Sequence, residues 1–139
     1  MLTRHEKVVA KYLREYAEPE VNALPKLSHY DYCLVIPAYD ETLENLERTW
    51  YQLKENYLVI LVVNAPHQGH AATLRLKQDI IRQAGVVDSV GHCSYVPGNP
   101  DILLVDRCTD GDTIPPRQGV GLARKIGADI ALRLGSEGR

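Results

Sequence analysis

Three aspartates lie close together in one segment of the chain. Asp106, Asp110 and Asp112 share this segment with glycine and threonine, and carboxylate oxygens at this density could hold Mg²⁺ or Mn²⁺. One hypothesis is therefore a divalent-metal phosphate enzyme that uses these three carboxylates. Aspartate beside glycine and threonine is also typical of a turn, in which the side chains bond to nearby backbone groups. We favour the turn.

A second notable segment is a short apolar run, which is followed directly by a tyrosine and two carboxylates. Cys33–Ile36 is typical of a buried strand, and we expect its pairing to stop at Pro37, which has no N–H to donate. Tyr39, Asp40 and Glu41 come next. In parallel α/β sheets, ligands bind just beyond the carboxyl ends of the strands. The segment therefore predicts the start of a ligand site.

Alternating helix and strand patterns surround this segment. The apolar spacing predicts helices over 3–16, 42–54, 70–84 and 120–134. It predicts strands over 33–36, 58–63 and 102–105, the second of them buried on both faces. This alternation favours an α/β fold, a three-layer sandwich in which a parallel sheet of at least three strands carries helices on both faces. We assign residues 1–30 to an N-terminal helix and connector, and residues 31–139 to one domain.

Composition limits the classes of function. The chain has 139 residues and a net charge of −2, which gives no electrostatic case for binding nucleic acid or an anionic membrane. No apolar run is long enough to span a bilayer, and the first residues show no signal-peptide pattern. The three scattered cysteines fit reduced thiols better than disulfides. We expect a cytoplasmic protein without a transmembrane segment.

Three segments, in order, resemble the nucleotide-sugar half of family 2 glycosyltransferases, which are inverting enzymes with the A-type fold. Residues 35–41 (VIPAYDE) are similar to the family's first-strand motif. Residues 61–66 (LVVNAP) lie where its second strand ends, usually in an aspartate that holds the base. Residues 119–127 (GVGLARKIG) are similar to its helix motif. The resemblance implies a Rossmann-like half that recognises a nucleoside-diphosphate sugar of the UDP or GDP type.

The resemblance also implies nucleotide-binding roles for five residues. Ala38 and Tyr39 would frame the base, with the tyrosine ring as a stacking surface. Glu41 would reach the ribose or the base. Asn64 would reach the base edge, although the family usually has aspartate there. Arg124 would contact the base or a phosphate.

The family's metal-binding Asp-x-Asp motif and its general base lie beyond a strand that follows the last helix, and so beyond Arg139. The resemblance therefore implies inverting sugar transfer, with Mn²⁺ or Mg²⁺, only in the intact enzyme. We expect this chain to be inactive alone, with no metal and no catalytic residue of its own. A non-catalytic nucleotide-binding or interaction module is the alternative. Because the missing strand would pair beside 33–36, we expect a homodimer through an exposed sheet edge or an uncovered apolar face.

Overall fold

The computed structural model describes residues 2–53, 56–65, 71–86, 88–109, 113–114 and 119–137. Over these residues the chain has an α/β fold with one five-stranded mixed sheet. The strands are β1 (Tyr32–Ala38), β2 (Tyr57–Asn64), β3 (Asp88–Val90), β4 (Cys93–Val96) and β5 (Asp101–Arg107). The helices are α1 (Arg4–Glu15), the 3₁₀ helix η1 (Pro19–Asn22), α2 (Leu43–Trp50), α3 (Ala71–Ala84) and α4 (Gly119–Ser136).

The strand order is β1-β2-β5-β4-β3, which leaves β1 at one edge. The strands β1, β2 and β5 are parallel, as predicted. The expectation of a wholly parallel sheet is wrong, because β3 and β4 form a hairpin and join β5 in the antiparallel sense. Gly91 makes the hairpin turn with a φ of 56°. Strands of three and four residues are too short to show a clear pattern in the sequence.

The strand β1 is longer than predicted. Pro37 lies in register with Val62, and Ala38 with Val63, so the expected stop at Pro37 is wrong. The reason is the position of the strand in the sheet. An edge strand pairs on one side only, so the side of proline that lacks an N–H can face the open edge. The polar residues therefore begin immediately after β1, at Tyr39.

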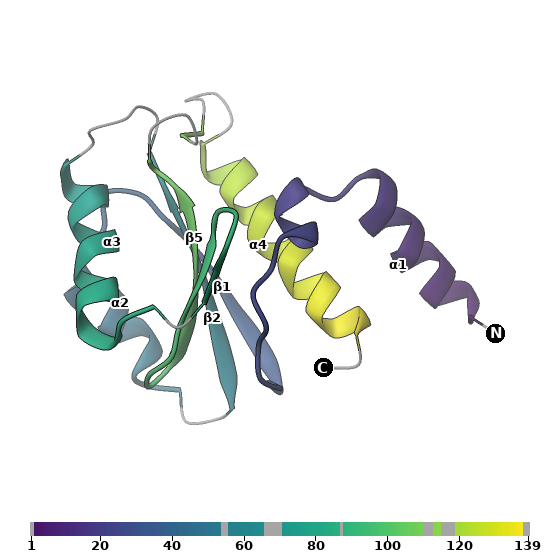
Figure 1. Cartoon of the computed structure of the whole chain (residues 1–139), viewed down its shortest axis with the longest axis horizontal. Helices are drawn as coiled ribbons and strands as arrows, with labels where there is room; N and C mark the ends of the chain where they lie inside the picture. The colour runs from purple at the N-terminus through teal and green to yellow at the C-terminus, as the bar shows by residue number, and fades with distance from the viewer. Residues whose placement is uncertain are drawn as a thin grey trace.

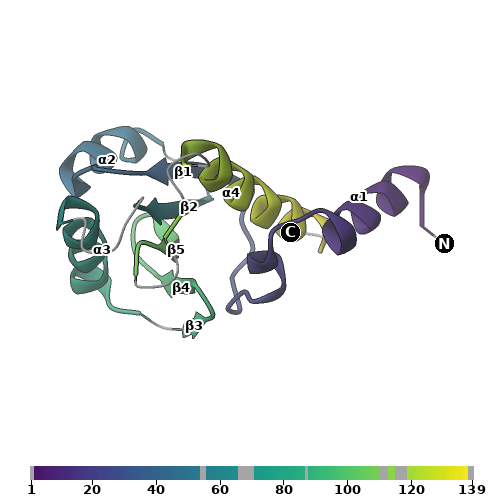
Figure 2. The same ribbon diagram turned by 90° about the horizontal axis from the view of Figure 1, so that it is seen from above.

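The strand β2 runs through the core, and all eight of its residues are buried, as predicted for a strand covered on both faces. Its side chains alternate between two apolar clusters. One cluster contains Ile60 with Ile126 of α4, and the other contains Leu61 with Trp50 of α2 and Leu76 of α3. Accordingly, α4 lies on one side of the sheet, and α2 and α3 lie on the other (Figures 1 and 2).

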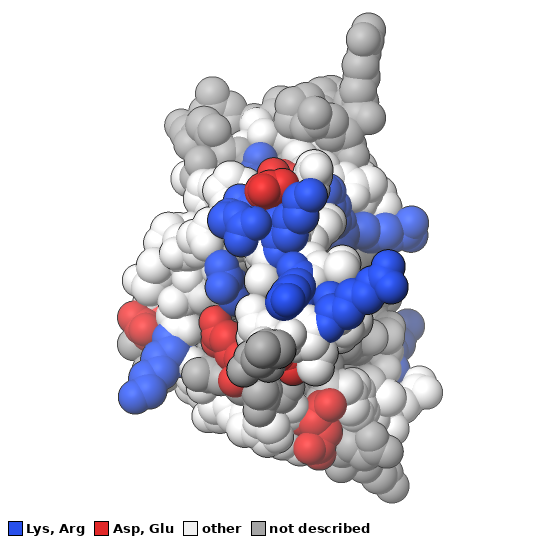
Figure 3. Space-filling model, turned by 90° about the vertical axis from the view of Figure 1, so that its right-hand side faces the viewer, with Lys and Arg blue, Asp and Glu red and all other residues white. Residues whose placement is uncertain are grey.

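The helix α1 begins with a capping box, in which Thr3 and Glu6 exchange hydrogen bonds. Only Leu13 of the predicted apolar face is buried, whereas Val8 and Tyr16 are 61% and 59% exposed. Most of α1 is exposed because the helix packs mainly against α4 and projects from the body of the molecule (Figure 2). Lysine and arginine side chains gather at this end of the molecule (Figure 3).

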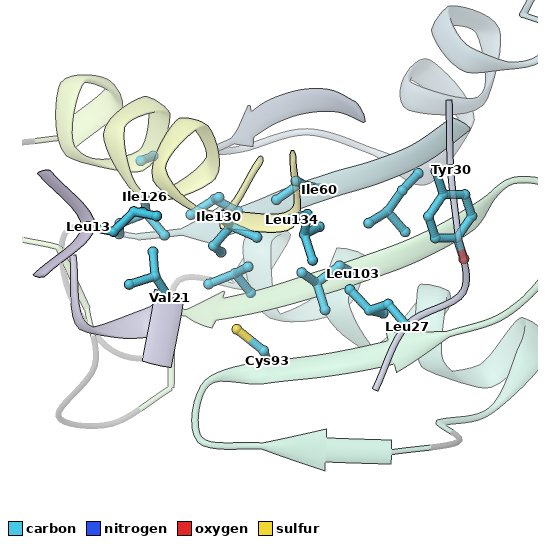
Figure 4. Close-up of a cluster of buried hydrophobic side chains, with 14 of the residues drawn as sticks. Leu13, Val21, Leu27, Tyr30, Ile60, Cys93, Leu103, Ile126, Ile130 and Leu134 are labelled. Atoms are coloured by element: carbon cyan, nitrogen blue, oxygen red, sulfur yellow. The ribbon is translucent and has the colours of Figure 1, made fainter. Parts of the chain in front are cut away.

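The N-terminal segment also contributes to the core on the α4 side of the sheet. Figure 4 shows Leu13 of α1, Val21 of η1 and Leu27 beside Ile130 of α4 and Leu103 of β5. Residues that are far apart in the sequence therefore share one apolar cluster, and the N-terminal segment adds a few side chains to it.

Helix limits differ slightly from the predicted ones. The helix α2 ends at Trp50 rather than residue 54, and α4 continues past Gly135 to Ser136. The helix α3 ends at Ala84, followed by Gly85 with a φ of 75°, as predicted. None of the described helices is long and apolar enough to cross a membrane.

Candidate functional site

The carboxyl ends of three strands meet at one edge of the sheet, because β1, β2 and β5 are parallel. Ala38 is in register with Val63, and Val63 with Asp106. Polar residues stand at or just beyond these positions, with Asp40 after β1 and Asn64 at the end of β2. The residues expected from the sequence to begin a ligand site thus lie at the carboxyl edge of the parallel strands.

The loop after β1 turns sharply at Asp40, which has a φ of 55°. Its backbone N–H donates to the hydroxyl of Thr73 at 3.4 Å, and Thr73 is fully buried at the start of α3. A non-glycine residue in this conformation costs roughly 1–3 kcal/mol, and such residues cluster at ligand sites. The turn brings the loop against α3.

A hollow of about 280 Å³ lies between this loop and α3. Three charged side chains line it, those of Glu41, Arg75 and Asp79. The other lining residues are Thr42, Ala71, Ala72 and Leu76. The volume is at the low end for ligand sites and suits one ring or one sugar. The first turn of α3 belongs to the wall, through Ala71 and Ala72.

Asn64 holds the ends of β1 and β2 together. It is buried, and its amide nitrogen donates to the carbonyl oxygens of Ala38 at 3.1 Å and Val62 at 3.3 Å. Both amide hydrogens are thereby used. A ligand would therefore have to bind Asn64 through Oδ1, and the side chain has a structural role besides the base contact implied by the resemblance.

Asp106 organises the turn that follows β5. Its Oδ1 accepts from the backbone N–H groups of Cys108 and Thr109, each at 3.0 Å. Its Oδ2 accepts from Lys77 Nζ at 2.7 Å and from the Thr109 hydroxyl at 2.5 Å. Burial alone would raise the pKa of Asp106, but the bonds from Lys77, Thr109 and Cys108 outweigh it and hold that pKa well below its usual range.

This bonding bears on the hypothesis of a metal site. Both carboxylate oxygens of Asp106 are engaged in the turn, which is the interpretation that we favoured. Asp110 and Asp112 lie outside the described residues. Within the part of the chain that the structure describes, no group of three or more His, Cys, Asp or Glu residues could hold a metal ion.

Two residues of α3 join the ends of the strands and were not found from the sequence. Thr73 reaches the loop after β1, and Lys77 reaches Asp106 after β5. They are four residues apart, so they lie on the same side of the helix. The sequence does show a threonine and a lysine four residues apart. This spacing points to contacts with the strand ends only once the path of α3 across the strands is known.

The remaining predicted residues lie at different depths. The side chain of Ala38 is fully buried, so it could frame a base only through its backbone, whereas Tyr39 is 44% exposed. Arg124 is exposed on α4. It precedes Gly127 by about one turn of α4, and it does not line the hollow beside Glu41.

The structure therefore brings some of the predicted residues together and separates others. Ala38 and Asn64 are in contact, and Glu41 faces α3 across the hollow. Tyr39 and Arg124 lie at the solvent surface.

Comparison with known proteins found no family model, no curated protein and no solved structure that matches this chain. The candidate site rests on the geometry of the chain itself.

Proposed function

We propose that the carboxyl edge of β1, β2 and β5 recognises the nucleotide part of a nucleoside-diphosphate sugar, of the UDP or GDP type. The observation that carries the proposal is the hollow of about 280 Å³ beside Glu41, which opens where the loop after β1 meets α3. This is the position at which parallel α/β sheets bind ligands. The strained turn at Asp40 supports it, because such turns are kept where function requires them.

Each role in the proposal follows from the chemistry of a side chain. Glu41 accepts hydrogen bonds from ribose hydroxyls, and the exposed ring of Tyr39 stacks on the base. Arg75, on the wall of the hollow, supplies a positive charge for a phosphate. Arg124 is a second candidate for a phosphate, from the opposite side of the sheet. Asn64 offers Oδ1 to the base edge.

We also propose that the fold is the one expected from the sequence, a Rossmann-like three-layer sandwich. Only the resemblance to family 2 glycosyltransferases suggests a reaction, which is sugar transfer with inversion. It would need a divalent metal, Mn²⁺ or Mg²⁺, to stabilise the departing diphosphate and a carboxylate to deprotonate the acceptor. A binding module without catalysis would use the same hollow. An assay of sugar transfer distinguishes the enzyme from the module.

We also propose self-association through β1. Among the residues that the structure describes, β1 is an edge strand whose sheet partner is β2, so the other side of residues 33–38 is a template on which another strand could pair. Sedimentation should show an average mass that rises with protein concentration. A mass that stays that of the monomer at all concentrations contradicts this part of the proposal.

Isothermal titration calorimetry with UDP, GDP and CDP, each with and without Mn²⁺, tests the nucleotide site. We expect one nucleotide to bind without metal, and Glu41→Gln to weaken it about tenfold, as for a lost hydrogen bond to a charged group. Glu44→Gln is the matched control, because Glu44 lies outside the hollow and pairs with Arg48 on the surface. Equal loss in both variants, or no binding by the unaltered chain, contradicts the proposal.

A further inference from the structure

A second and larger groove lies at the other end of the molecule, between α1 and the last turns of α4. Its volume is about 980 Å³, at the upper end of the range for ligand sites. Six of the residues that line it are apolar: Leu2, Val9, Ala10, Leu13, Ala131 and Leu132. His5, Arg14 and Arg133 also line it, together with one carboxylate, Glu6, and the polar side chains of Asn22 and Ser136. An apolar groove with basic groups would suit a ligand that has an apolar part and a negative charge.

One end of the groove is fixed by a polar cluster that joins α1 to α4. The Tyr12 hydroxyl donates to Asp129 at 2.6 Å. Lys125 Nζ donates to Asp129 at 2.9 Å, to Glu18 at 2.7 Å and to the carbonyl oxygen of Tyr16 at 2.8 Å. These bonds hold the C-terminal end of α1 against the middle of α4. The groove between the remaining turns is therefore a defined feature of the fold.

Arg133 brings a positive charge to this groove, and no described carboxylate forms an ion pair with it. Its Nη2 donates to the neutral side chain of Asn22 at 2.9 Å, and its Nε is buried without an acceptor among the described residues. Within the described part of the chain, no carboxylate lies within 4.0 Å of this guanidinium. A buried N–H without an acceptor is unfavourable, and a guanidinium pairs best with a carboxylate.

The surroundings of the groove are also basic. Arg4, Lys7, Lys11 and Arg14 are exposed on α1, and Figure 3 shows lysine and arginine gathered at this end of the molecule. A positive field of this kind attracts anions from solution. It also disfavours a second copy of the chain in the groove, because two such ends would repel each other. The apolar wall in turn favours a ligand with a hydrocarbon part.

We propose that this groove binds a carboxylate carried on a single apolar chain, of the fatty-acid type. The carboxylate lies on the guanidinium of Arg133, with Arg14 close to it. The hydrocarbon chain lies along Leu13, Val9 and Leu132. The site is separate from the nucleotide site, and neither depends on the other.

Titration calorimetry with three probes of equal chain length, kept below their micelle concentrations, tests this proposal. The probes are sodium dodecanoate, dodecanol and dodecyltrimethylammonium. We expect dodecanoate to bind with one-to-one stoichiometry, and Arg133→Gln to weaken it at least about tenfold. Dodecanol should bind more weakly and equally to both proteins, which shows that the groove of the variant remains intact. Arg133→Lys should recover part of the affinity.

Arg82→Gln is the matched control, because Arg82 is exposed on α3 and lies outside the groove. It should leave dodecanoate binding unchanged. Equal binding of all three probes would mean that the groove selects no charge and would overturn the proposal. The proposal would also be overturned if dodecanoate did not bind, or if Arg133→Gln and Arg82→Gln weakened its binding equally. A dimer that dissociates on Leu132→Asp would overturn it as well, because a second copy of the chain would then occupy the groove.

Discussion

Gly127 of α4 packs directly on Val35 of β1. A Cβ atom built on Gly127 would overlap Cγ1 of Val35, at a separation below the 3.0 Å that real Cβ atoms respect. The absence of a side chain therefore lets the helix approach the edge strand closely. Gly127 is the last glycine of the GVGLARKIG segment, and this contact gives it a packing role. It also fixes where Arg124 lies relative to the end of β1.

Replacing Gly127 by alanine should destabilise the protein. The added methyl group must displace Val35 or push α4 away from the sheet, and overpacking of this kind costs about 1–3 kcal/mol. Gly121→Ala is the matched control, since no atom lies within 4 Å of a Cβ at that position. It should be neutral, or stabilising by up to about 1 kcal/mol, through helix propensity. Urea unfolding of both variants measures the difference, and equal effects would contradict the close contact.

The carboxylate of Asp106 should make stability depend on pH in acid. Its pKa is lowered in the folded state, so its contribution is fully present above the ordinary value of 3.8 and is lost as the pH falls below it. Asp106→Asn should cost roughly 1–3 kcal/mol near neutral pH, as for a hydrogen bond to a charged group. The gap in unfolding free energy between the two proteins should narrow as the pH falls. A gap that stays constant would show that the bonds to Lys77 and Thr109 do not stabilise the charged form.

The three thiols should differ in reactivity. Burial raises the pKa of Cys93 and of Cys108 to about 12, with smaller contributions from Glu20 and Asp106 respectively. Burial also raises the pKa of Cys33, which is only half-buried. Because the thiolate is the reactive form, iodoacetamide should label Cys33 first and the other two slowly. Mass spectrometry of the native and the urea-unfolded protein checks this order, and rapid native labelling of Cys93 would contradict its burial.

Much of the sheet could be predicted because its central strand carries a clear signal. The continuous apolar run over 58–63, which is rich in β-branched residues, predicts a strand buried on both faces, and it forms most of β2. The hairpin of β3 and β4 could not be predicted, since Asp88–Val90 and Cys93–Val96 are short and mix polar with apolar residues. The end of β1 was predicted too early, because the effect of Pro37 on pairing depends on whether its strand lies at an edge of the sheet.

The candidate site was predictable only in part, for a similar reason. Tyr39 and Glu41 stand next to a strand in the sequence, so their place at its carboxyl end follows directly. The link from Lys77 to Asp106 depends on how α3 crosses the sheet, which no local pattern specifies. The groove beside α1 depends on the bond between Tyr12 and Asp129, which are far apart in the sequence.

The central claim is that a nucleotide binds at the carboxyl ends of the parallel strands. Amide resonances of the labelled protein, recorded during a titration with UDP and then with GDP, test it most directly. We predict that shifts for one of the two nucleotides concentrate at residues 38–42, at Asn64 and at 71–79, where the hollow and its supports lie. No shifts with either nucleotide, or shifts confined to the groove beside α1, would contradict the account.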